Sequence, residues 1–381
     1  MAMWTAAYGR AAKRALIGLL APLALVLPAP VRAAVPAVES DSAAPVADLD
    51  AWNAAKLMGI GTNIGNTLEN TKTWETGWGN PRITKAYIQK LAALGFRTVR
   101  LPVAWDAYAH HGRIDADKLA RVGEIVDWVR QAGMLCVVNI HWDGGWIDSD
   151  DKKRFAKTYH TFSAEAERKY RSYWSQIAGH FADRDQHVIF EGLNEETDFS
   201  GTGSEEKAYA TLAHVNQLFI DTVRKSGGNN ATRLLIITGY STDILKTTNG
   251  RFSLPTDSVP HRLLLSVHYY TPWAFAGIDR DDGGQKMQPT WGSEADIAEL
   301  NRLFDRMGDF SHRKDIPVFL GEFAPNPLKD RASRVRWMLA VAQGALARQM
   351  VPILWETGAD ISREPPYAPS PALSEVLQKL L

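Results

Sequence analysis

The sequence has almost none of the residues that cross-links and metal centres need. Its 381 residues include one cysteine, Cys136, which excludes an intrachain disulfide and any zinc or iron–sulfur centre held by several cysteines. The apolar neighbours of Cys136 predict a buried thiol. No His-x-His or His-Glu-x-x-His spacing occurs, so we expect no metal site.

The chain also lacks an excess of charge of either sign. Lys and Arg total 43, Asp and Glu total 43, and no basic stripe recurs along the chain. This balance argues against nucleic acid or an anionic membrane surface as the main partner. A Gly-x-Gly-x-x-Gly turn after the first strand and a Walker sequence are missing too, which argues against a nucleotide cofactor.

What remains is an ordinary globular composition with many tryptophans. The chain is 45% hydrophobic and 23% charged, which excludes disorder over its bulk. It contains 13 Trp, and flat aromatic faces suit both core packing and the stacking of sugar rings. The tryptophan count therefore gains meaning only from where those residues fall.

The N-terminus has the pattern of an export signal. Residues 1–33 contain four basic residues and no acidic one, and the uncharged run Ala15–Val31 ends at a small-residue cleavage pattern. A membrane anchor is the alternative, but the strongly apolar part, Ala15–Leu27, is short for a span and contains Pro22. We therefore predict a signal peptide over residues 1–33.

Residues 34–50 show no periodicity and are rich in Ala, Val, Pro, Ser and Asp, which predicts a short leader. The mature chain would be mildly acidic and secreted, either periplasmic or extracellular, with no membrane contact once the signal is removed. No coiled-coil pattern occurs, so a monomer is the default expectation.

Short apolar runs alternate with helix-period segments over residues 51–381. The eight predicted strands are Leu57–Thr62, Thr98–Leu101, Leu135–Ile140, Val188–Leu193, Leu234–Thr238, Leu263–His268, Pro317–Leu320 and Val351–Leu354. The predicted helices are Thr84–Leu94, Ala116–Gln131, Ala164–Phe181, Glu205–Lys225, Thr242–Thr247, Glu294–Met307, Asp330–Arg348 and Ser374–Leu381. Eight such repeats favour one α/β domain, a closed (β/α)8 TIM barrel, over an open doubly wound sheet.

Polar and aromatic residues follow most of the predicted strands, at the end of the barrel where such folds carry their chemistry. They are Asn63, Asn66, Arg100, His141, Trp142, Asn194, Glu195, Glu196, His268, Tyr269, Tyr270, Glu322 and Trp355. Each alone has a structural explanation, such as an ion pair or core packing. Their shared location predicts a binding site.

Two carboxylates decide the chemistry of that site. Glu195 and Glu322 follow apolar strands, so both should point into the mouth of the barrel, where a lone carboxylate is costly. A purely structural pair, held by Arg100 and the histidines, is one alternative. Glycoside hydrolysis needs such a pair, because one acid protonates the leaving oxygen and one anion attacks the anomeric carbon.

Motifs that carry a resemblance to a known family recur along the chain: Met58–Glu69, Trp78–Pro81, Val99–Trp105, Ile140–Trp142, Phe190–Glu195, His268–Tyr270 and Gly321–Phe323. Together they resemble glycoside hydrolase family 5, the large cellulase family. The resemblance runs from about Leu57 to Trp355, and the first two motifs look like the bacterial endoglucanase branch that also contains xyloglucanases and lichenases. It implies a retaining (β/α)8 glycosidase that needs no cofactor.

The resemblance also implies roles. Glu195 matches the acid/base and Glu322 the nucleophile, while Arg100 and Tyr270 match the groups that hold the nucleophile ionised. The remaining matches concern the sugar: Asn194 bonds its 2-hydroxyl, His141 and His268 line the cleavage point, and Trp355 lies under the sugar before the scissile bond. From their places after strands, we also predict that Asn66 and Trp142 bind substrate.

Retention requires opposite protonation of two close carboxyl groups. Arg100 and Tyr270 should lower the pKa of Glu322, and the resulting charge, with burial, should raise the pKa of Glu195. After the glycosyl-enzyme forms, Glu195 can then act as a base toward water.

The resulting functional prediction is a secreted endo-β-1,4-glucanase acting on cellulose-type or mixed-linkage β-glucan. A xyloglucanase, lichenase or mannanase is the alternative on the same catalytic core. A catalytically dead barrel that only binds glycans is the alternative of a different class. The loops Trp142–Trp146 and Pro272–Trp291 carry aromatics with a hypothetical role in sugar stacking.

Overall fold

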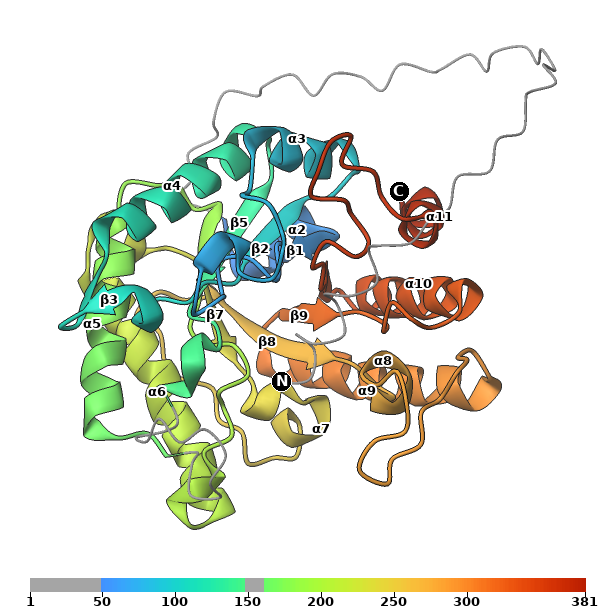
Figure 1. Ribbon diagram of the computed structural model, residues 1–381. Helices are drawn as coiled ribbons and strands as arrows, with labels where there is room; N and C mark the ends of the chain where they lie inside the picture. Colours follow the sequence, from blue (N-terminus) through green and yellow to red (C-terminus); the bar gives the residue numbers. More distant parts are fainter. Residues whose placement is uncertain (1–48, 148–160) are drawn as a thin grey trace. The chain divides into compact units, whose positions relative to one another are not determined.

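A closed barrel of eight parallel strands forms the centre of the molecule (Figure 1). The computed structural model describes residues 49–147 and 161–381. The strands are β1 (Gly61–Asn63), β2 (Thr98–Leu101), β5 (Leu135–Asn139), β6 (Val188–Glu191), β7 (Leu235–Thr238), β8 (Leu263–Tyr269), β9 (Val318–Phe323) and β10 (Val351–Leu354). They follow the order β1-β10-β9-β8-β7-β6-β5-β2, and β1 closes the barrel by pairing with both β2 and β10. The predicted (β/α)8 fold is confirmed.

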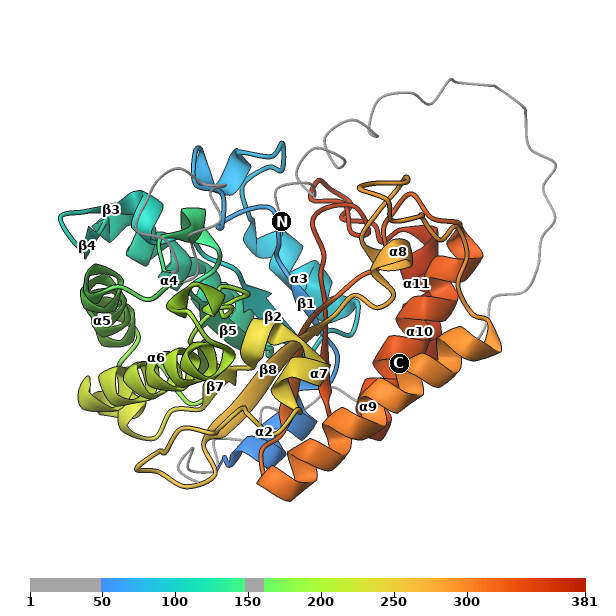
Figure 2. The same ribbon diagram turned by 90° about the horizontal axis from the view of Figure 1, so that it is seen from below.

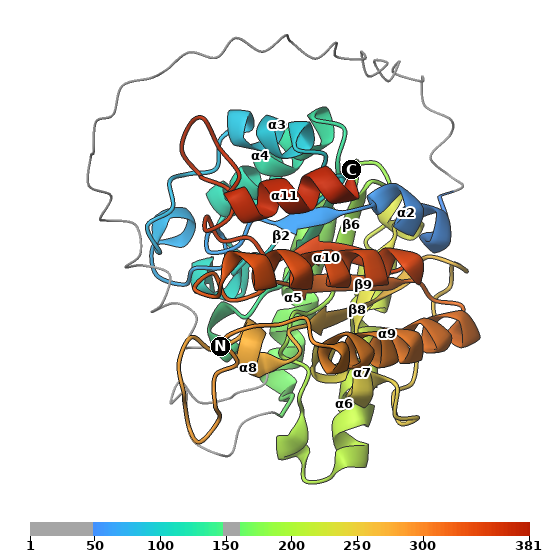
Figure 3. The same cartoon turned by 90° about the vertical axis from the view of Figure 1, so that its right-hand side faces the viewer.

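Helices cover the outside of the barrel (Figure 3). They are α3 (Lys85–Ala93), α4 (Ala116–Gln131), α5 (Ala164–His180), α6 (Glu205–Lys225), α7 (Ile244–Thr247), α9 (Glu294–Lys314), α10 (Arg331–Ala347) and α11 (Pro371–Leu380). Most begin at a side chain that accepts a backbone N–H of the first turn; Ser293, for example, forms a full capping box with Asp296 at the start of α9. Successive side chains of a strand point to opposite sides. On β5, Cys136 and Val138 pack toward the helices, whereas Leu135 and Val137 point into the barrel. Cys136 is buried, as predicted.

The first predicted strand is partly wrong, because its opening residues form a helix. Leu57 lies in α2 (Ala51–Met58) and is half exposed, and β1 begins only at Gly61. Asp50 caps α2 by accepting the backbone N–H of Asn53 at 2.7 Å. The buried face of α2 packs with strand residues inside the barrel (Figure 2). This helix therefore closes the N-terminal end of the barrel.

Other differences are local. Helix α11 begins three residues earlier than predicted because Ser370 caps it and a proline occupies its first turn, and α9 runs on to Lys314. The sequence reading missed the hairpin of β3 (Ala109–His110) and β4 (Arg113–Ile114), and the short helix α8 (Trp273–Ala276). It also missed the 3-10 segments, which are η2 (Trp74–Thr76), η3 (Asp106–Tyr108), η4 (Asp143–Gly145), η5 (Ser200–Thr202), η6 (Gly228–Ala231) and η7 (Tyr240–Thr242).

The predicted signal peptide and residues 34–48 of the predicted leader lie outside the described residues. Leu49 and Asp50 are part of the barrel body, since the Leu49 carbonyl accepts a hydrogen bond from Arg262 and Asp50 caps α2. Within the described ranges, no helix combines the length and the hydropathy that crossing a membrane requires.

Candidate active site

Arg100, on β2, is the centre of a buried polar cluster at the C-terminal end of the barrel. Its Nε donates to Glu191 at 2.6 Å, its Nη1 to Glu322 at 2.8 Å, and its Nη2 to the Asn194 Oδ1 at 3.0 Å. The side chain is fully buried. Burial opposes the charge of Arg100, but the carboxylates of Glu191 and Glu322 outweigh it and raise its pKa. The guanidinium therefore keeps its positive charge, and its hydrogen bonds link β2 to β6 and β9.

Glu322, on β9, is held from both sides. One oxygen accepts from Arg100 and the other accepts the hydroxyl of Tyr270 at 2.8 Å. Asn63 fixes the same strand, since it accepts from Arg100 at 3.0 Å and donates to the Gly321 carbonyl at 2.9 Å. Two donors aimed at one carboxylate leave it little rotational freedom, and they favour its ionised form.

Glu195, just beyond β6, lies across the site from Glu322. Its Oε1 is 2.8 Å from Nδ1 of His268, and that nitrogen is 3.7 Å from an oxygen of Glu322. One oxygen of each carboxylate and a ring nitrogen of His268 all lie within 4.8 Å of one another. That closeness fits the separation of about 5 to 5.5 Å in retaining glycosidases and is below the ~6.5 to 9.5 Å of inverting ones.

With two close carboxylates at the strand ends, the comparison with known proteins decides the family. Residues 60–360 match the family model of cellulase, glycosyl hydrolase family 5. The chain belongs to glycosyl hydrolase family 5. It is therefore a glycoside hydrolase, and the resemblance stated from its motifs is confirmed.

Individual family 5 relatives cover most of the chain. Endoglucanase A of Paenibacillus barcinonensis is 33% identical over 83% of this chain and 85% of its own length. A xyloglucan-specific endo-beta-1,4-glucanase of Bacteroides ovatus is 30% identical over 82% of this chain and 66% of its own. Among solved structures, a broad-specificity endoglucanase from an uncultured bovine rumen ciliate superposes with a TM-score of 0.77 at 29% identity, covering 87% of this chain and 98% of that one.

Protonation of the carboxylate pair depends on His268. Burial would raise the pKa of Glu195, but the hydrogen bond to His268 and the charge of that ring outweigh it, so the pKa of Glu195 is lowered. Burial raises the pKa of Glu322 against the opposing charges of His268 and Arg100. Burial also opposes the charge of His268, yet the two carboxylates raise its pKa. The predicted order of the two carboxyl pKa values is therefore wrong for this arrangement, because the sequence reading did not place the His268 ring nitrogen 2.8 Å from Glu195.

The other predicted sugar-binding residues fall into two groups. His141 stacks on Trp355 with ring centroids 5.7 Å apart and planes 6° from parallel, and burial together with the charges of Arg100 and His268 lowers its pKa well below the usual value. A neutral imidazole and a half-buried indole therefore form one wall of the site. Asn66 and Trp142 lie in the loops after β1 and β5; the Asn66 backbone, at φ 54°, is tied to Glu69. Sugar binding by these two side chains stays a prediction.

Sequence reasoning gave no role to several residues that hold this site in place. Glu191 accepts from Arg100, from Asn139 at 3.1 Å and from Ser266 at 2.8 Å, and is fully buried. Its signal was present, since an acidic residue inside the apolar run Val188–Leu193 needs a buried partner. The position of that partner, Arg100 on β2, could come only from the closed barrel.

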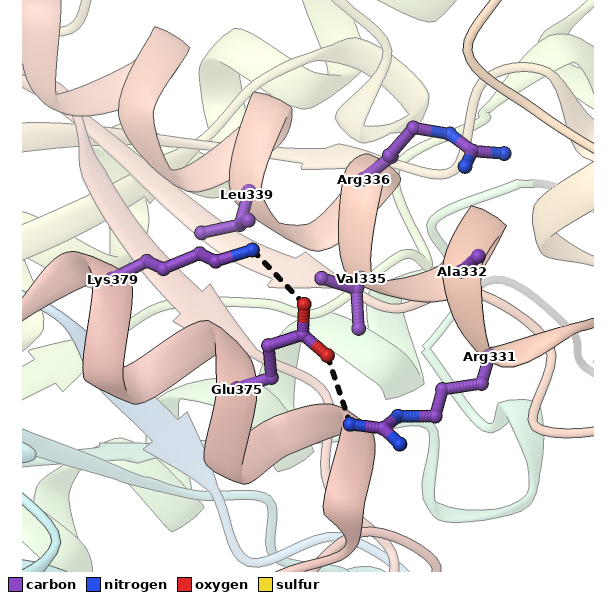
Figure 4. A pocket seen from close by; sticks show the side chains of 7 residues that line it. All are labelled: Arg331, Ala332, Val335, Arg336, Leu339, Glu375 and Lys379. Carbon is purple, nitrogen blue, oxygen red and sulfur yellow. Dashed lines mark hydrogen bonds and ion pairs between the residues drawn. The ribbon is translucent and has the colours of Figure 1, made fainter.

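A hollow between α10 and α11 differs from the carboxylate site in its lining and in its place in the fold (Figure 4). Its polar lining includes Glu375, which accepts from Arg331 and Lys379 at 2.9 Å each. It is formed by covering helices, not strand ends, and contains one carboxylate instead of a pair. It lacks the arrangement that glycoside hydrolysis needs.

Proposed function

We propose that this glycoside hydrolase is an endo-β-1,4-glucanase that cleaves β-glucan chains internally by double displacement. The observation that carries the proposal is the close pair of carboxylates, one clamped by Arg100 and Tyr270 and one bonded to His268. The relatives support the substrate class, because they are endoglucanases and a xyloglucan-specific endoglucanase.

In the first step, an oxygen of Glu322 attacks the anomeric carbon and the bond to the leaving sugar breaks. Glu195 gives a proton to the leaving oxygen as it departs. Glu195 is suited to that role because its side chain is 29% exposed, whereas that of Glu322 is 4% exposed. The Nδ1 of His268 lies 2.8 Å from Oε1 of Glu195, so the two groups can share the proton that Glu195 donates.

In the second step, water attacks the anomeric carbon of the glycosyl-enzyme. Glu195 takes a proton from that water, and the bond between the sugar and Glu322 breaks, which regenerates the carboxylate. Arg100 and Tyr270 stabilise the charge that returns to Glu322.

Three further groups act on the sugar itself. The Nδ2 of Asn194 is buried and has no hydrogen-bond partner within the described residues, while its Oδ1 is held by Arg100. A buried donor of this kind is suited to a sugar hydroxyl, and we assign it the 2-hydroxyl. His141 and Trp355 supply the neutral, flat wall beside the same sugar.

Xyloglucan is the second candidate substrate. A Bacteroides ovatus xyloglucanase in complex with a XXXG heptasaccharide superposes on this chain with a TM-score of 0.76 at 27% identity, over 87% of this chain and 77% of that one. Release of reducing sugar from carboxymethylcellulose, xyloglucan, mixed-linkage β-glucan and mannan, using the chain from Ala34 onward, ranks the candidates. We expect the highest rate on one of the glucans and none with Glu322→Gln. Binding without turnover in the unmodified protein would favour the glycan-binding alternative.

Export and a monomeric state are also part of the proposal. The basic N-terminus, the apolar run and the small-residue cleavage pattern of residues 1–33 support export. N-terminal sequencing of the protein recovered from periplasm or medium tests it, and light scattering of the same sample measures the oligomeric state.

A further inference from the structure

Glu191 is a buried carboxylate of the active-site cluster that takes no part in the proposed mechanism. It belongs to β6, and its side chain is fully buried. Its Oε1 accepts from Ser266 at 2.8 Å, and its Oε2 accepts from Arg100 at 2.6 Å and from Asn139 at 3.1 Å. A carboxylate enclosed by protein donors cannot reach a sugar. Any influence of Glu191 on the reaction must therefore pass through one of these neighbours.

Arg100 is the neighbour that connects Glu191 to the reaction, because its guanidinium pairs with two carboxylates. Its Nε is 2.6 Å from Glu191, and its Nη1 is 2.8 Å from Glu322. Burial opposes the charge of Arg100, but first Glu191 and then Glu322 raise its pKa. Arg100 does not hold the pKa of Glu322 low, since burial raises that pKa against the charges of His268 and Arg100. A cation shared between two anions stabilises each of them less than it would stabilise one alone.

The two carboxylates differ in what happens to their charge during double displacement. Glu322 loses its negative charge when its oxygen bonds to the anomeric carbon, and it regains that charge when water releases the sugar. Glu191 forms no bond to the sugar and keeps its charge through both steps. Without that charge, the contacts of Arg100 in the glycosyl-enzyme, with Asn63, Asn194 and the esterified Glu322, would all be to neutral groups. A buried cation bonded in this way is strongly unfavourable.

We infer that Glu191 is a positioning residue that acts as the lasting counter-ion of Arg100, so that Glu322 can give up its charge to the sugar without leaving the guanidinium unpaired. This inference rests on the proposed double displacement. It requires that the charge of Glu191 favours formation of the glycosyl-enzyme but not its breakdown.

A first consequence concerns the pH profile. Charged or titratable groups face Glu322 from β2, from beyond β6 and from the end of β8; they are Arg100, Glu195, His268 and Tyr270. His141, at the end of β5, stays neutral because burial lowers its pKa. Glu191→Gln leaves all of these in place and removes one charge, so Arg100 acts on Glu322 alone and the pKa of Glu322 falls. The acidic limb of kcat/KM on cellohexaose should move to lower pH by about one unit.

A second consequence separates the two chemical steps. A dinitrophenyl 2-deoxy-2-fluoro-β-cellobioside traps the glycosyl-enzyme, so the loss of activity measures its formation. Recovery of activity in cellobiose, after removal of excess reagent, measures its breakdown. For Glu191→Gln we expect inactivation to slow by about a hundredfold, because Glu322 must lose the only charge left on Arg100's bonded partners. Recovery should be as fast as in the unmodified enzyme or faster, because breakdown returns that charge.

Asp257→Asn is the matched control. Asp257 forms another buried pair with an arginine, accepting from Arg224 at 2.9 and 2.6 Å, but it lies in the segment before β8 and not at the strand ends. Its loss should lower the urea midpoint and leave the acidic limb and both rates unchanged. Glu191→Asp keeps the charge at a greater distance from Arg100, so its inactivation rate should lie between those of the Gln variant and the unmodified enzyme.

Equal slowing of inactivation and recovery in Glu191→Gln, or an acidic limb that does not move, would show a structural role and overturn the inference. If the Gln variant does not fold, Glu191→Asp supplies the same test, since slower inactivation without slower recovery is still expected and equal slowing still contradicts it. If mass spectrometry shows that the unmodified enzyme is not labelled on Glu322, the proposed function fails, and the inference with it.

Discussion

The two ends of the barrel are built from the same eight strands but have opposite interiors. At the N-terminal end, Ala51, Ala54 and Met58 of α2 pack against apolar strand residues that point into the barrel. At the C-terminal end, the interior holds Arg100, two carboxylates bonded to it, and Glu195 with His268. The apolar end contributes stability through burial. The polar end concentrates buried charge, which folding alone does not favour.

This division predicts that substitutions at the two ends separate activity from stability. The largest effect is expected for Glu195→Gln, which removes the proton donor but keeps the shape. Cleavage of cellohexaose should fall about a thousandfold or more, within the range of general acid catalysis. An activated leaving group needs no proton, so the rate on β-cellobiosyl fluoride in the first step should fall far less. Equal losses on both substrates would contradict the role of Glu195 as the acid.

Substitution of Arg100 should affect activity and stability together, because this residue is buried and also contacts the proposed nucleophile. Arg100→Lys retains one charge but cannot reach Glu191, Glu322 and Asn194 together. We expect a loss of about 3 kcal/mol in the free energy of unfolding and a fall in kcat of roughly a hundredfold. Urea unfolding and kinetics on the same preparation measure both, and a change in only one of them would show that the cluster has a single role.

Met58→Ala tests the closed end. Met58 is fully buried in α2, so its truncation should cost about 2 to 5 kcal/mol of unfolding free energy. kcat/KM per folded molecule should remain unchanged, because the site lies at the other end of the strands. A fall in kcat/KM that persists at temperatures where the variant is fully folded would show that the two ends are coupled.

Tyr270→Phe should give the smallest effect and a distinctive one. The Tyr270 hydroxyl donates to Glu322 and lowers the pKa of that carboxyl, so its removal raises this pKa. Glu322 must be ionised to attack, so the acidic limb of the pH profile of kcat/KM should move to higher pH, by about one unit. Activity is then lost first at low pH and retained at high pH. An unshifted acidic limb would mean that the bond does not stabilise the ionised nucleophile.

The same comparison explains what the sequence could predict. Arg100, Asn194, Glu195, His268, Tyr270 and Glu322 were all identified from their places at strand ends, because parallel strands bring their C-terminal ends together in space. The residues that the site brings into direct contact are therefore the ones that a one-dimensional rule can find. Their pKa order was not predictable, since it depends on the ring nitrogen of His268 facing Glu195.

Features that depend on tertiary contact were missed. The end of α2, Leu57 and Met58, runs directly into the apolar segment that was predicted as a strand, and the role of the helix as a plug needs the barrel interior to be known. Helix α8 is a single turn, too short for a periodic pattern to reveal, and tertiary contacts such as that of Lys329 with the Ala274 carbonyl hold it in place. Glu191 was read as part of an apolar strand because its partner lies 91 residues away.

The stereochemistry of the first product tests the central claim most directly. Proton NMR spectra recorded within the first minutes of cellohexaose cleavage distinguish the two anomers of the newly formed reducing end before they equilibrate. Double displacement by Glu322 and Glu195 predicts that the β anomer appears first, because two inversions restore the original configuration. Early formation of the α anomer would show a single displacement by water and would contradict the assignment of Glu322 as the nucleophile.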